Sequence, residues 1–133
     1  MNINEIDKED VGFLNHIGGK LVDLSDGYAQ VAFEIKPFHK QHHGSVHGGA
    51  IATLADHTGW YAVISELDAV FTSVTIELKV NYLKPAVGDV LRAEARVINR
   101  TKRTAFVTIE VFAKDTLIAY ATGTYAILED KKC

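Results

Sequence analysis

Asp56 lies in the middle of a segment, residues 47–64, whose other members are mostly apolar or small. Gly48 and Gly49 open this segment, and its composition is typical of a helix enclosed by other elements. An ionised carboxylate without partners is costly to bury, so Asp56 is either tied into hydrogen bonds or kept for chemistry. A carboxylate kept for chemistry can serve as a general base or as a nucleophile.

The whole chain has the size and composition of one domain, residues 1–133, with a substantial core: 47% of its residues are hydrophobic. The formal net charge of -3 argues against nucleic acid as a partner. No apolar run approaches the ~20 residues that cross a bilayer, so no membrane partner is expected. An acidic, polar start and a single cysteine, Cys133, favour the cytoplasm and exclude an intrachain disulfide.

The first half of the chain predicts two strands and two helices around the segment with Asp56. A short helix is expected at about 4–15, and strands at 17–24 and 28–35 flank a Ser-Asp-Gly turn, a strong hairpin signal. Residues 38–46 form a loop rich in His and Gly that leads into the central helix, about 48–66.

The second half changes to a period of two residues, which predicts successive antiparallel strands at 73–82, 90–98, 104–112 and 117–128. In the first of these strands one apolar face is expected, made of Val74, Ile76, Leu78, Val80 and Tyr82. An α+β fold follows, in which the sheet curls around the central helix. The remaining side of that helix is expected to meet a second subunit across a two-fold axis.

Several motifs occur in an order that resembles one known family. They are His47-Gly48-Gly49, Leu54-Ala55-Asp56, Val74-Thr75-Ile76-Glu77, Asn81-Tyr82-Leu83-Lys84-Pro85-Ala86 and Gly88-Asp89. Together they closely resemble the hotdog-fold acyl-CoA thioesterases of the phenylacetate-degradation type, over nearly the whole chain. The resemblance implies a curved antiparallel sheet of about five to six strands around one long helix. It also implies hydrolysis of acyl-CoA without a cofactor, in a homodimer or dimer of dimers with active sites between chains.

The resemblance also implies roles for individual residues. The family's catalytic acid matches Asp56, the amide that polarises the thioester carbonyl matches Gly48, and the histidine before it matches His47. A hydroxyl that positions the acid or the water matches Thr75, with Ser73 as its neighbour on the same face. The family often has Asn six residues before the histidine, where this chain retains an amide in a different residue, Gln41.

The distance between Gly48 and Asp56 gives an independent reason for a composite site. Eight helical steps separate them, about 12 Å along the axis, whereas reacting groups must approach within roughly 3–3.5 Å. Two antiparallel helices across a two-fold axis would bring Asp56 of one chain to the Gly48 end of the other. There the helix amino terminus suits a developing oxyanion, and Gly48 and Gly49 admit substrate to the backbone.

Other candidates have both a functional and an ordinary structural explanation. Trp60 and Thr53 lie one turn either side of Asp56, where they line an acyl pocket or simply fill the core. As pocket residues, their bulk would favour a medium-chain or aromatic acyl group. The basic residues at one strand turn either hold the phosphates of coenzyme A or form a solvated surface. They are Arg100, Lys102 and Arg103.

The histidines suggest a metal site, but their spacing matches no standard zinc pattern, so none is expected. They are His39, His42, His43, His47 and His57. A polar loop beside the active site explains the first four better, and His57 is expected to make an interface hydrogen bond. Two other classes of function remain open, a non-catalytic acyl-CoA-binding hotdog domain and a hotdog dehydratase or hydratase. The acid at position 56 argues against the former. Enzymes of the latter class pair a catalytic His with an acid in sequence settings that are not found here.

Overall fold

The computed structural model describes residues 12–129, in which two α-helices, one short 3-10 helix and six strands follow one another. In chain order they are α2 (Gly12–His16), β1 (Lys20–Ser25), β2 (Tyr28–Glu34), η1 (Pro37–His39), α3 (Gly48–Ile64), β3 (Phe71–Tyr82), β4 (Val90–Arg100), β5 (Thr104–Ala113) and β6 (Thr116–Glu129). Most of the helix expected at 4–15, and Cys133, lie outside the described residues. No helix within them has the length and apolar character that a membrane span requires.

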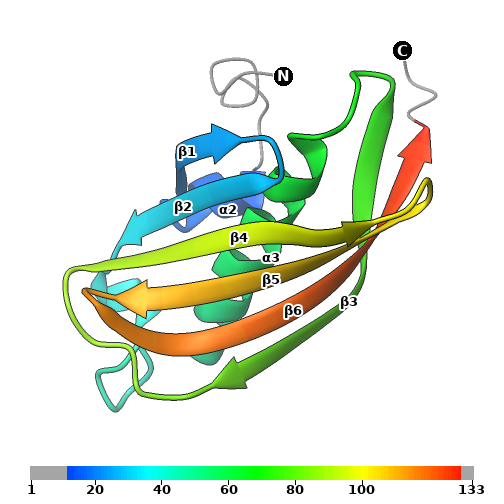
Figure 1. Cartoon of the computed structure of the whole chain (residues 1–133). Coiled ribbons are helices and arrows are strands. Elements are labelled where there is room, and N and C mark those ends of the chain that lie inside the picture. Colours follow the sequence, from blue (N-terminus) through cyan, green and yellow to red (C-terminus); the bar gives the residue numbers. More distant parts are fainter. Residues whose placement is uncertain (1–11, 130–133) are drawn as a thin grey trace.

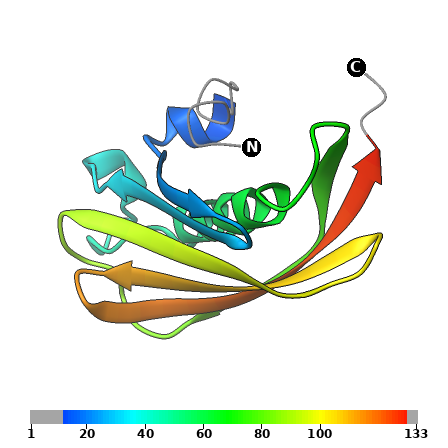
Figure 2. The same ribbon diagram turned by 45° about the horizontal axis from the view of Figure 1, so that its top comes forward.

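The six strands form one antiparallel sheet in the order β1-β2-β4-β5-β6-β3. The sheet curves around α3, which lies on its concave face and contacts all six strands (Figures 1 and 2). The expected α+β architecture, a curved antiparallel sheet around one long helix, is therefore confirmed. Its two edges within the described residues are β1 and β3.

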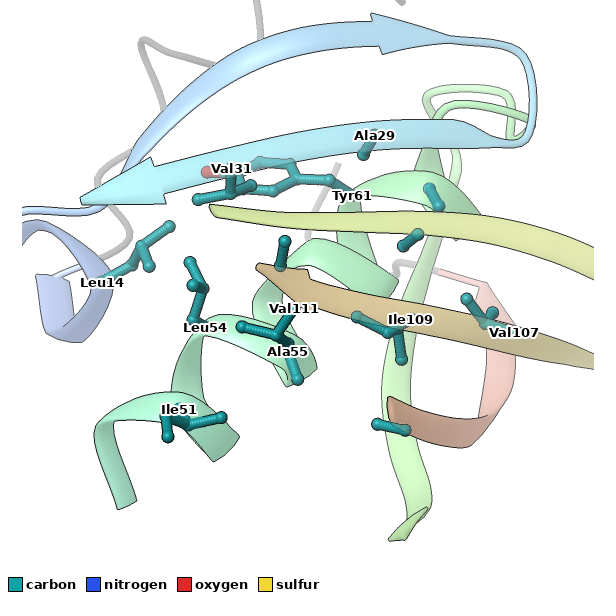
Figure 3. Packing of buried hydrophobic residues seen from close by; sticks show 14 of the residues in the cluster. Leu14, Ala29, Val31, Ile51, Leu54, Ala55, Tyr61, Val107, Ile109 and Val111 are labelled. Atoms are coloured by element: carbon teal, nitrogen blue, oxygen red, sulfur yellow. The ribbon is translucent and has the colours of Figure 1, made fainter. Parts of the chain in front are cut away.

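The core lies between α3 and the concave face of the sheet (Figure 3). Its strand residues are mainly alternate ones of β2, β4, β5 and β6, because successive side chains of a strand point to opposite faces. The strand side chains labelled there are Ala29, Val31, Val107, Ile109 and Val111, and those from α3 are Ile51, Leu54, Ala55 and Tyr61. Small side chains on both sides let the helix approach the sheet closely.

The carboxyl end of α3 is tied to the hairpin between β1 and β2. Ser65 caps the helix, and its Oγ donates to the Ala62 carbonyl and accepts from the Gly27 amide. Gly27 has a φ of +74°, which only glycine adopts freely, so the predicted Asp-Gly turn has a specific contact. This capping ends α3 at Ile64, two residues before the expected end.

One face of α3 is not covered by the sheet. Thr53, Asp56, His57 and Trp60 are only partly buried in the single chain. The expectation that one sheet leaves a side of this helix uncovered therefore holds for the single chain. This open face contains the acid.

Strand β3 departs from the expected alternation because it contains a β-bulge. The pairing with β6 slips between Thr75 and Glu77, so that Ile76 is the extra residue. Leu78 and Val80 pack against the core, whereas Val74 and Ile76 are 49% and 60% exposed. The prediction of one continuous apolar face from 74 to 82 is thus wrong before the bulge, since a one-residue shift reverses the faces.

Candidate active site

The Asp56 carboxylate is held by two neighbouring strands. Thr75 on β3 donates its hydroxyl hydrogen bond to Asp56 Oδ1 over 2.7 Å. Tyr125 on β6 donates from its phenol to the Asp56 carbonyl oxygen at 2.9 Å and to Oδ1 at 3.2 Å. Thr75 and Tyr125 are direct cross-strand partners, so the sheet register brings both donors to the same carboxylate. The sequence predicted Thr75 beside this acid and missed Tyr125.

Tyr125 remains a hydrogen-bond donor at neutral pH. Burial raises the pKa of its phenol far above the usual value of 10, and the charge of Asp56 and the hydrogen bond to it act in the same direction. The phenol therefore stays protonated and donates to the Asp56 carboxylate.

At the amino end of α3, one backbone amide remains available. His47 is the N-cap residue, and its Nδ1 accepts from the Gly49 amide at 2.8 Å. The His47 carbonyl accepts from the amides of Ala50 and Ile51. Within residues 12–129 the Gly48 amide has no acceptor. Gly48 therefore presents a free N–H at the positive end of the helix dipole, whereas the amide of Gly49 is already occupied.

Gly48 borders a cavity of about 490 Å³. Gln41 and Gly49 share this cavity, and the Gln41 amide donates to Ser45 Oγ at 2.7 Å. The Tyr82 phenol donates to the Gly48 carbonyl at 2.9 Å. Four sequence-predicted residues thus gather at the amino end of the helix, where a free amide borders the cavity: Gln41, His47, Gly48 and Gly49.

Asp56 does not line that cavity. The acid and the free amide belong to one helix and remain about 12 Å apart by helical rise. The basic cluster is farther still from the mouth, because Arg100 donates to the Glu66 carbonyl just beyond the opposite end of α3. Lys102 and Arg103 are exposed in the following turn. One chain therefore does not bring the three groups of predicted residues together.

Two polar side-chain atoms, one in the residue after Asp56 and one on β3, are buried without a hydrogen-bond partner in the described part of the chain. They are His57 Nδ1 and Ser73 Oγ. Burial lowers the pKa of His57 below its ordinary 6.5. The charge of Asp56 acts to raise that pKa but is the smaller effect. The indole of Trp60 donates to the Ser73 carbonyl at 2.9 Å, so this side chain is fixed against β3 beside the acid.

The histidines of the loop before α3 do not assemble a metal site in the described residues. His39 is buried, with Nδ1 accepting from the Lys36 amide and Nε2 bonded to the Ile17 carbonyl. His42 and His43 are exposed and lie ring to ring. From residue 12 to residue 129, no three His, Cys, Asp or Glu side chains gather closely enough to hold an ion.

Residues 43–120, more than half of the chain, match the sequence model of the thioesterase superfamily. The chain belongs to this superfamily. The thioesterase is also 35% identical, over 96% of its own length and 85% of the relative, to the "Putative esterase" of Saccharolobus solfataricus. It is 33% identical to the acyl-coenzyme A thioesterase PaaI of Escherichia coli, over 71% of this chain and 66% of that protein.

Solved structures agree with this assignment. A conserved protein from Pseudomonas aeruginosa superposes with a TM-score of 0.85 at 33% identity, over 88% of this chain and 94% of that one. A mutant of the phenylacetic acid degradation protein PaaI from Thermus thermophilus gives a TM-score of 0.79 at 30% identity, over 86% and 96%. The predicted hotdog-fold thioesterase family is therefore confirmed, and this thioesterase is an enzyme of the thioester-hydrolase class.

Proposed function

We propose that the thioesterase hydrolyses acyl-CoA to the free acid and coenzyme A, with Asp56 as general base or nucleophile. The observation that carries this proposal is the Asp56 carboxylate, partly open to solvent yet fixed through Oδ1 by donors from two strands. The acyl-CoA substrate is supported by the resemblance to the acyl-coenzyme A thioesterase of Escherichia coli. The free Gly48 amide supplies the donor that a thioester oxygen needs as it becomes negative.

The active site is proposed to form between two chains. Asp56 lies on the open face of α3, and β3, twelve residues long, is an edge strand of the described sheet. A long edge strand, an open helix face, and exposed Val74 and Ile76 on the opposite face of β3 are surfaces that proteins normally cover. Two-fold pairing of the α3 faces would place Asp56 opposite the partner's Gly48 and create two equivalent sites. A dimer of such dimers belongs to the same proposal.

Two chemical routes fit this arrangement. In the first, Asp56 takes a proton from water while the water oxygen attacks the thioester carbonyl, and the Gly48 amide holds the oxyanion. The oxyanion then collapses, and the coenzyme A thiolate leaves and takes up a proton. In the second, Asp56 itself attacks and expels the thiolate, and water then cleaves the mixed anhydride. After one turnover in water enriched in ¹⁸O, label in the Asp56 carboxylate identifies the second route with water attack at the Asp56 carbon of the anhydride. Attack at the acyl carbon would label the product acid, as the first route does.

Substrate contacts beyond the reacting atoms follow from the same pairing. Trp60, fixed one turn from Asp56, is proposed to limit the acyl group and to favour a medium-chain or aromatic one. Lys102 and Arg103 lie beyond the carboxyl end of α3, and an antiparallel partner would bring that end toward the amino end of the first helix. These two side chains are the proposed contacts for the phosphates of coenzyme A. Arg100 is already engaged by the Glu66 carbonyl.

The test is release of free thiol from short, medium, long and aromatic acyl-CoAs. We expect Asp56→Asn to lower kcat by about a thousandfold, as loss of a general base or nucleophile does. Asp68→Asn is a matched control, because Asp68 is exposed in the turn after α3 and away from the acid. Full turnover by Asp56→Asn would overturn the proposal. Binding of acyl-CoA without thiol release would favour a non-catalytic domain, and loss of water from a hydroxyacyl-CoA would favour a dehydratase.

A further inference from the structure

Tyr125 is a buried polar side chain that the sequence pattern did not single out and that contacts the acid directly. It is fully buried at 0% exposure, and its phenol has two acceptors, both on Asp56. We propose that Tyr125 is the positioning residue that fixes the orientation of the Asp56 carboxylate. This proposal rests on the proposed function, because it assigns a role to a residue that acts through the catalytic acid.

Two glycines make the slot that holds the Tyr125 ring. A Cβ at Gly59 would overlap the phenol oxygen, and a Cβ at Gly123 would come within 2.7 Å of ring atom Cε2. Gly59 is on α3, three residues after Asp56, and Gly123 is on β6, two residues before Tyr125. Neither glycine has a positive φ. Their lack of a side chain is therefore explained by the ring between them and not by backbone conformation.

The two acceptors of the phenol fix both the helix and the side chain. The bond to the Asp56 carbonyl anchors the backbone of the acid, and the bond to Oδ1 restricts rotation of its carboxyl group. Oδ1 also accepts from Thr75, whereas Oδ2 accepts no hydrogen bond from residues 12–129. Oδ2 is thus the oxygen left for the reacting water or carbonyl. Fixing Oδ1 stops the carboxylate from rotating freely and holds Oδ2 in one orientation. Holding a reacting group in the productive orientation raises the reaction rate.

Packing alone does not account for a tyrosine here. Phenylalanine would fill the same space between the glycines, and burying a hydroxyl in a core is costly unless it has a partner. Among residues 12–129, the phenol oxygen finds hydrogen-bond partners only on Asp56. Its distinct contribution is therefore the donor, and Tyr125→Phe removes that donor while the ring remains.

The experiment compares kcat and KM of Tyr125→Phe with those of the intact thioesterase. We expect kcat to fall about tenfold, because one hydrogen bond to a charged group is lost, while KM stays within about twofold. Tyr28→Phe is the matched control, because Tyr28 also donates from its phenol to a carboxylate, that of Glu94, on strands away from Asp56. A wild-type kcat in Tyr125→Phe would overturn the proposal.

Gly59→Ala tests the slot itself. The new methyl group displaces the phenol, so kcat should fall by at least as much as in Tyr125→Phe. Gly59→Ala should cost less kcat in Tyr125→Phe than in the intact protein, because the overlapping oxygen is absent, although the new methyl group would still lie 2.9 Å from ring atom Cζ. Independent, multiplicative losses would contradict the proposed coupling.

The proposal remains testable if the intact protein releases no thiol from any acyl-CoA, an outcome that would overturn the proposed function alone. Crystal structures of the intact protein and of Tyr125→Phe then decide. A carboxylate that turns away from Thr75, or divides between two orientations, in the variant supports the positioning role. A carboxylate that keeps one unchanged orientation without the phenol refutes it.

Discussion

The middle of α3 and its amino end differ in how their functional groups are held. In the middle, Asp56 receives hydrogen bonds from Thr75 and Tyr125, which belong to two different strands. At the amino end, the hydrogen bonds are mostly local, such as the one from the Gly49 amide to His47. The Gly48 amide donates to no acceptor among the described residues. The chain thus completes the orientation of the acid by itself but leaves the amide open. In the proposed dimer, each site would combine a rigid half, the hydrogen-bonded Asp56 of one chain, with the free Gly48 amide of the other chain.

Mixed dimers test most directly whether each site needs the acid of one chain and the amide of the other. Asp56→Asn removes the acid, and Gly48→Pro removes the amide N–H and adds a ring at the same position. Proline is well tolerated at the first position of a helix, and the preceding His47 already has a ψ of 136°, which suits a residue before proline. We expect each variant alone to lose activity, the first by about a thousandfold.

Refolding the two inactive variants together should restore activity, because a mixed dimer carries one site with both groups intact. Random pairing predicts recovery to about a quarter of the wild-type rate. Thiol release is measured after mixing, with refolded wild-type protein as the reference. No recovery, despite exchange of subunits shown by mass spectrometry, would mean that each site is built within one chain.

The amino end can be examined separately by comparing Gly48→Pro with Gly48→Ala. Loss of an oxyanion donor costs about a hundredfold in kcat, so Gly48→Pro should show an effect of that order. Gly48→Ala keeps the amide, and the nearest atoms to the new methyl, on Tyr82, are 3.4 Å away, so its loss should be about tenfold smaller. Equal kcat values in the two variants would exclude the amide as the donor. Circular dichroism checks that both remain folded.

Much of this arrangement could be predicted from the sequence, because local signals determine it. The two glycines after His47 mark the start of α3, the Asp-Gly pair marks the first hairpin, and alternation reveals the four later strands. Thr75 was predicted beside the acid by resemblance. These are features of short segments, or of a motif that is read in order.

The rest depended on how distant segments meet. The bulge at Ile76 is invisible in an alternating run, because the extra residue matters only once β6 is placed beside β3. Tyr125 likewise resembles an ordinary aromatic residue of a strand. The signals that could have found it are Gly123, two residues before it on the same face, and Gly59 on the helix. Their connection to Tyr125 requires the register that pairs Thr75 with Tyr125.

Thr75 is the second side chain that donates a hydrogen bond to the Asp56 carboxylate. Thr75→Val keeps the shape of the side chain and removes its donor to Oδ1, so kcat should fall about tenfold. Thr75→Ser keeps a hydroxyl and should retain most of the activity, which makes it the matched control. Steady-state thiol release measures both. A Thr75→Val enzyme with wild-type kcat would show that Tyr125 alone suffices to hold the acid.

The smallest effect is expected from the basic turn, which touches neither half of the site within one chain. Lys102→Ala with Arg103→Ala should raise KM for acyl-CoA about threefold at low salt and leave kcat unchanged, since exposed charge contacts are weak and screened. Lys114→Ala is the control, because Lys114 lies in the β5–β6 turn at the other end of the sheet from Lys102. The difference should shrink as salt is raised, because screening removes the same contribution from the wild-type enzyme. A KM that is unchanged at low salt would leave these side chains as a solvated surface and require the phosphates of coenzyme A to bind elsewhere.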